Sequence, residues 1–94
     1  MRRITVKNLR TLCGYLNDLT GQPSEPWSED ENGRMKANVG NYHISQAYGG
    51  YCLHQMMNEG GGVTCPIQHG HGPARELFEK MHAFMAGIRT ERGD

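Results

Sequence analysis

The sequence lacks a surplus of charge of either sign. Ten Lys and Arg residues balance ten Asp and Glu residues, so the formal net charge is zero with histidine neutral. Dedicated binders of nucleic acids or anionic membranes usually carry a basic surplus. The composition therefore argues against both functions, although the first ten residues form a local basic region with Arg2, Arg3, Lys7 and Arg10.

Long apolar runs are also absent. No stretch approaches the roughly 20 apolar residues that cross a bilayer, and the N-terminus has no apolar core of a signal peptide. The cysteines, Cys13, Cys52 and Cys65, are odd in number and unevenly spaced, which does not suit a disulfide framework. We therefore expect reduced thiols in a cytoplasmic protein with no membrane partner.

The length favours one small domain. A chain of 94 residues, 36% of them hydrophobic, can bury a single core. The sequence contains no internal repeat and no low-complexity tract. We therefore predict that residues 1–94 form one domain.

Residues 5–20 have the periodicity of an amphipathic helix. Thr5 can cap the first turn through its hydroxyl, and Gly21 can end the helix in the left-handed conformation. The apolar residues recur at steps of three and four and share one face: Val6, Leu9, Leu12, Cys13, Leu16 and Leu19.

A second amphipathic helix is predicted after Gly72-Pro73, with the proline at the first helical position. Its charges suit the helix dipole, because Glu76 lies near the start and Arg89 near the end. Its apolar face consists of Leu77, Phe78, Met81, Phe84, Met85 and Ile88.

The segment between the helices favours strands. Asn32-Gly33 predicts a hairpin between a short strand at residues 26–29 and a second strand that starts at Arg34. The apolar alternation of this second strand changes parity near Gly40, which indicates a bulge. A third strand is expected over residues 51–57, followed by a loop over residues 63–72.

The expected fold is α+β with the order α-β-β-β-α. It is a three-stranded antiparallel meander with both helices packed on one face and the other face open. In the third strand, period two predicts that Tyr51, Leu53 and Met57 point toward the helices. The residues expected on the open face are Cys52, His54 and Met56.

Part of the chain resembles a known group of proteins. The stretch ANVGNYHISQAYGGYCLHQMMNEGGGV at residues 37–63, with LNDLTG before it and ARELFEKMHAFMAGI after it, is similar to small proteins encoded by phages and prophages. That group has no known function. The resemblance implies a bacterial cytoplasm and a phage accessory role, and it supplies no catalytic residue.

Histidine and cysteine side chains suggest metal binding as one alternative function. If Ser45 pairs with Gly50, then His43 lies opposite Cys52, with His54 on the same face. A second set follows in the loop, Cys65-x3-His69-x-His71. These are zinc ligand types, but neither set has the paired spacing of structural zinc sites. The candidate ligands are His43, Cys52, His54, Cys65, His69 and His71. His82 also has a side chain suited to zinc but belongs to neither set.

Nucleic-acid binding is a second alternative. The order α-β-β-β-α is that of double-stranded-RNA-binding domains. Those domains resemble this chain in element order only, because the last helix here starts with one arginine beside an acid. The residues that could contact phosphates are Arg2, Arg3, Lys7, Arg10, Arg34 and Lys36, and Trp27 or Tyr48 could stack on bases.

Catalysis is not expected. Cys52 with His54, or Cys65 with His69, could act as nucleophile and base, but no third orienting group is evident. The sequence therefore favours a non-enzymatic binding or adaptor protein without a cofactor. It would bind an unidentified protein through the open sheet face or through the pair of helices. A second copy could bind through the open sheet face or through the edge strand near Trp27.

Overall fold

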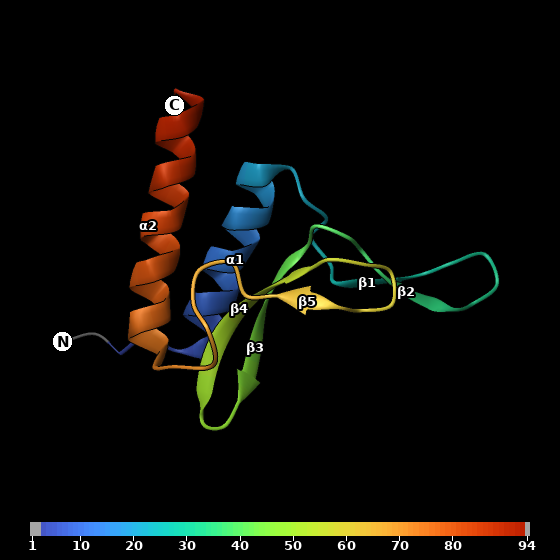
Figure 1. The fold of residues 1–94 in the computed structure, drawn as a ribbon, viewed down its shortest axis with the longest axis horizontal. Coiled ribbons are helices and arrows are strands. Elements are labelled where there is room, and N and C mark those ends of the chain that lie inside the picture. The colour runs from blue at the N-terminus through green and yellow to red at the C-terminus, as the bar shows by residue number, and fades with distance from the viewer. Residues whose placement is uncertain (1–2, 94) are drawn as a thin grey trace.

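The computed structural model describes residues 3–93 and confirms the α+β class (Figure 1). In that part of the chain, five strands lie between two helices in the sequence. The elements are α1 (Val6–Thr20), β1 (Trp27–Glu29), β2 (Met35–Ala37), β3 (Tyr42–Ala47), β4 (Gly50–Met56), β5 (Val63–Thr64) and α2 (Ala74–Arg92).

Both ends of α1 are capped as the sequence predicts. The Thr5 hydroxyl accepts a hydrogen bond from the Asn8 backbone, and the Asn8 side chain accepts one from the Thr5 backbone. This reciprocal pair satisfies two of the amide groups that a helix leaves free at its start. Gly21 adopts φ 69° and ends the helix.

The second helix, α2, begins one residue later than predicted, because Pro73 is its N-cap rather than its first helical residue. Its buried residues are Leu77, Met81 and Met85, which lie on the predicted apolar face. No helix among residues 3–93 combines the length and hydropathy needed to cross a membrane.

The predicted second strand is divided into β2 and β3. Residues 38–41 form a turn in which the Asn41 amide donates to the Asn38 carbonyl and Gly40 adopts φ 95°. The parity change near Gly40 therefore marks a full turn rather than a single-residue bulge. As a result β1 and β2 form a separate two-stranded sheet, which projects from the helices in Figure 1.

The main sheet has the order β3-β4-β5, so its third strand comes from a segment that was expected to be a loop. A tight turn sets the register of β3 and β4, because Tyr48 and Gly49 both adopt positive φ and Ala47 pairs with Gly50. Ser45 consequently pairs with Cys52 rather than with Gly50. The expectation that His43 faces Cys52 was wrong, because His43 pairs with His54.

Both helices pack on one face of the main sheet, as predicted. Tyr42 and Leu53 supply the sheet side of a buried cluster to which both helices contribute. The helical members are Leu9, Leu12, Cys13, Leu16, Leu77, Met81 and Met85. Burial of these apolar surfaces is the main favourable contribution to folding.

The opposite face of the sheet is not open, contrary to expectation. Residues 65–71, which we call the covering segment, lie against it. The following Gly72 exchanges two backbone hydrogen bonds of 2.8 and 2.9 Å with Tyr51. Cys52 lies on this face, which we call the outer face, and it is 0% exposed beneath the covering segment. Met57 lies beyond the end of β4 and is 55% exposed, so its predicted inward position was wrong.

A buried amide joins α1 to the edge of the sheet. The Asn17 side chain donates to the Tyr42 carbonyl at 2.9 Å and accepts from the Tyr42 amide at 2.8 Å. Strand β3 is the edge strand on this side, so these backbone groups have no partner strand. The Asn17 side chain makes the hydrogen bonds that a neighbouring strand would make to Tyr42, and it thereby fixes the position of α1 against β3.

We expect Asn17→Ala to lower the free energy of unfolding by about 2–4 kcal/mol, because it leaves two buried backbone groups unsatisfied. Urea denaturation monitored by circular dichroism measures this change. Asp18→Ala, at the exposed neighbouring position, is the control and should change stability by less than about 0.5 kcal/mol. Equal effects of the two substitutions would contradict the role given to Asn17.

Candidate metal centre

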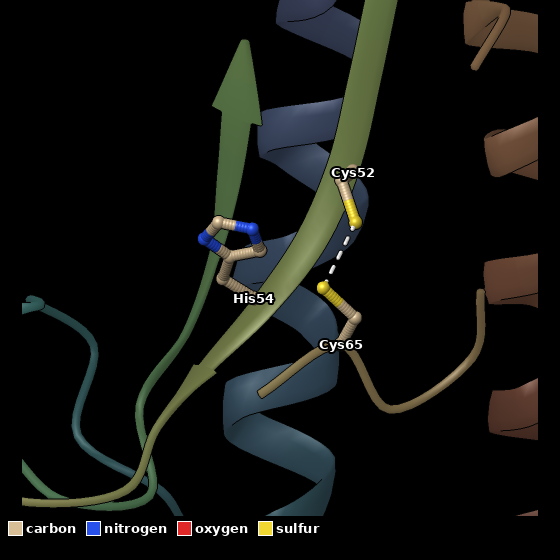
Figure 2. A group of neighbouring side chains, drawn as sticks. All are labelled: Cys52, His54 and Cys65. Atoms are coloured by element: carbon tan, nitrogen blue, oxygen red, sulfur yellow. Dashed lines mark hydrogen bonds between the residues drawn. The ribbon is translucent and has the colours of Figure 1, made fainter. Parts of the chain in front are cut away.

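Strand β4 and the segment that follows β5 bring three potential metal ligands together on the outer face. Cys52 and His54 are two residues apart on β4, so their side chains project from the same face. Gln55 pairs with Thr64, and continuing this antiparallel register places Cys65 beside His54. Figure 2 shows Cys65 on the segment that follows β5, with its sulfur directed toward that of Cys52.

The distances in this cluster suit a single metal ion. One ligand atom from each of Cys52, His54 and Cys65 lies within 4.8 Å of the other two. The two sulfur atoms are 3.5 Å apart, and both cysteines are free thiols. Two thiolates that bind one tetrahedral zinc ion at about 2.3 Å lie roughly 3.8 Å apart. The observed sulfur separation is close to that value.

Burial sets the protonation of the two β4 ligands. Burial, together with the hydrogen bond and the charge of Cys65, raises the pKa of the Cys52 thiol to about 11. Burial also lowers the pKa of His54, and the neighbouring His71 lowers it too. His54 is therefore in its neutral, metal-binding form at pH 7. A metal would have to displace protons from the thiols, so binding should release protons.

Two further histidines border the cluster. The His43 ring lies 5.6 Å from the His54 ring, and the His71 ring lies 5.8 Å from it on a centroid basis. His43 Nδ1 is 3.2 Å from the Asn41 side-chain oxygen, and His71 Nε2 is 2.9 Å from the Ser45 hydroxyl. Each ring therefore has one nitrogen held by a polar neighbour.

The remaining predicted ligands do not join this group. His69 is exposed on the covering segment, and His82 lies on the exposed side of α2 beside Phe78. The sequence suggested two separate sets, one on the strands and one in the loop. The structure instead combines Cys65 of the loop set with Cys52 and His54 of the strand set.

The predicted nucleic-acid-binding residues fall into two separate regions (Figure 1). One region is the start of α1, and the other is the projecting β1–β2 hairpin. Arg3, Lys7 and Arg10 belong to the first region, and Arg34 and Lys36 to the second. Arg2 lies outside the described residues. The predicted set therefore does not form one continuous basic face.

The predicted catalytic pairs receive little support from the chemistry of the site. A nucleophilic cysteine needs a lowered pKa, whereas the pKa of Cys52 is raised to about 11. The second predicted pair joins Cys65 to His69, and His69 lies outside the ligand cluster. The cluster is better suited to holding a metal than to nucleophilic attack.

Comparison with known proteins does not assign the chain to a family. No protein-family model matches it, and neither curated proteins nor solved structures give a match. The similarity to phage-encoded proteins therefore stays a prediction from the sequence. Any function must be argued from the site itself.

The histidines predict how the stability of the metal-free protein depends on pH. Burial, and then the charge of a neighbouring histidine, lowers the pKa of both His43 and His54 from 6.5. The unfolded chain then binds more protons than the folded chain at acid pH. We expect the free energy of unfolding to decrease as the pH falls below 6.5.

Urea denaturation in the presence of a chelator, repeated at several pH values, measures this dependence. The double variant His43→Gln/His54→Gln should show a smaller loss of stability on acidification. His82→Gln, which removes an exposed histidine, is the matched control and should keep the wild-type dependence. A double variant with the wild-type dependence would show that these two histidines do not cause it.

Proposed function

We propose that this chain is a non-enzymatic zinc-binding module in which Cys52, His54 and Cys65 hold the ion. The observation that supports this proposal is the convergence of three ligand atoms within 4.8 Å from two separate segments. Thiolate and imidazole ligands favour zinc over calcium or magnesium, which prefer oxygen.

The ion would have a structural effect on the covering segment. Backbone pairing holds this segment only at its two ends, through β5 and through the bridge between Gly72 and Tyr51. Cys65 lies between those ends. A bond from zinc to Cys65 would extend the attachment of this segment to β4 beyond the end of β5 and would stabilise a small domain whose core is limited.

The protein should bind one zinc ion per chain, and the ion should raise its stability. At a free zinc concentration 100 times Kd, binding adds about 2.7 kcal/mol to the free energy of unfolding. Metal analysis after equilibrium dialysis gives the stoichiometry, and urea denaturation with zinc or chelator gives the stabilisation. Cys52→Ser and Cys65→Ser should each abolish most of the stabilisation.

Cys13 provides the matched control for these variants. It is also a buried free thiol, but it packs in the helical core away from the cluster. Cys13→Ala should lower stability through lost packing and should still bind one zinc ion. Zinc-independent stability in the wild-type protein would refute the proposed function.

The projecting hairpin supports a second candidate, self-association of a binding or adaptor protein. The pairings Trp27 with Ala37 and Glu29 with Met35 place Trp27 and Met35 on one face of the β1–β2 sheet. Trp27 is 41% exposed and Met35 is 61% exposed. Exposed apolar side chains that share a face are typical of interaction surfaces. We propose that this face binds the same face of a second copy.

Sedimentation equilibrium over a range of protein concentrations tests the second candidate. The wild-type protein should form a dimer, and Met35→Lys should shift it toward the monomer by adding an unpaired charge to the contact. Tyr48→Lys is the control, because Tyr48 is 98% exposed on a different hairpin. A wild-type monomer at all concentrations, or a Met35→Lys protein that dimerises normally, would exclude this interface.

A further inference from the structure

We infer that His71 is the fourth ligand and that it closes the site into a Cys2His2 zinc centre. This inference rests on the proposed zinc function. Three protein ligands leave one position of a tetrahedral ion open, and the identity of the fourth group decides what the ion can do. A fourth protein ligand makes the site structural, whereas bound water would make it chemically reactive.

The path of the chain places the His71 side chain over β4. Gly72 bonds to Tyr51 along the edge of β4 that faces away from β3. The neighbouring His71 nevertheless reaches the Ser45 hydroxyl on β3, at 2.9 Å from Nε2. Because β3 lies on the opposite side of β4, the side chain must cross the outer face to make this contact.

That crossing brings the His71 imidazole close to the proposed ligands. Ser45, which holds the ring, is the direct cross-strand partner of Cys52. The ring is also 5.8 Å from that of His54. Cys65 therefore lies on the β5 side of the β4 ligands, and the His71 ring, which enters from the same edge of β4, ends on the β3 side. This arrangement surrounds a position above β4 with four candidate ligands, two cysteines and two histidines.

The hydrogen bond to Ser45 prepares His71 for this role. When Nε2–H donates to the Ser45 hydroxyl, Nδ1 carries the lone pair that can bind zinc. Histidines that bind metals usually donate their other N–H to an oxygen atom, which fixes the tautomer and the ring orientation. His71 is not among the three residues within 4.8 Å of one another, so binding must draw its ring inward.

His43 is the other histidine beside the site, and it is less suited to bind the ion. It pairs with His54, one position further along the face from the Ser45–Cys52 pair, and its Nδ1 faces Asn41. It lies beside His54 on β3, whereas His71 is held by Ser45, the cross-strand partner of Cys52. His43 is therefore a matched control with the same side chain at a similar distance from His54.

Titration with Co²⁺, followed by competition with zinc, tests the inference. Wild-type protein should show thiolate charge-transfer absorption together with the strong visible bands of a tetrahedral ion. His71→Ala should weaken zinc binding by at least about 10-fold and reduce the visible bands. Ser45→Ala should have a smaller effect of the same sign, and His43→Ala should match the wild type.

His71→Cys gives a positive result that a general loss of folding cannot mimic. This variant should keep tight binding and should increase the charge-transfer intensity, because a third thiolate replaces an imidazole. If His71→Ala and His71→Cys both match the wild type in affinity and spectrum, the inference is overturned while the zinc proposal stands. If the wild-type protein binds neither ion, the proposed function fails and this inference fails with it.

Discussion

The burial of both faces of β4 is the constraint on which the rest of the structure depends. Leu53 and Cys52 are adjacent in sequence and point to opposite faces, yet both are 0% exposed. The two helices cover the Leu53 face, and within residues 3–93 no regular element remains for the Cys52 face. The irregular segment between β5 and α2 covers it instead. A strand buried on both sides normally belongs to a larger protein with helices on each face.

Irregular segments can cover a sheet only if their backbone groups find partners, and this chain meets that need with few contacts. On one edge, the Asn17 amide bonds to Tyr42. On the other edge, Gly72 bonds to Tyr51. The second contact requires close approach, because a Cβ atom on Gly50 would lie 3.0 Å from the Gly72 backbone. These local contacts replace the long hydrogen-bond ladders of a larger sheet.

Local chemistry made the helices and the faces of the strands predictable. The caps of α1, the apolar face of α2 and the alternation around Leu53 each depend on residues close together in sequence. The break at residues 38–41 and the pairing of Ser45 with Cys52 were not predicted correctly, because turn geometry decides them. A turn at Tyr48 was hard to foresee, since a tyrosine with φ 54° is unusual. The short strand β5 carries no pattern of its own and depends on its neighbour β4.

The candidate site was predictable in its residue types but not in its grouping. Cys52-x-His54 is readable as two ligands on one strand face, whereas Cys65 joins them only through the register between β4 and β5.

Burial alone would not have identified the site either. Cys13 and Cys52 are both buried cysteines with raised pKa values. Burial raises the pKa of Cys13 to about 12, and burial together with Cys65 raises the pKa of Cys52 to about 11. Cys13 packs among leucines and behaves as a small apolar residue. Cys52 faces a second sulfur and a neutral imidazole, and that difference in neighbours is what points to a metal.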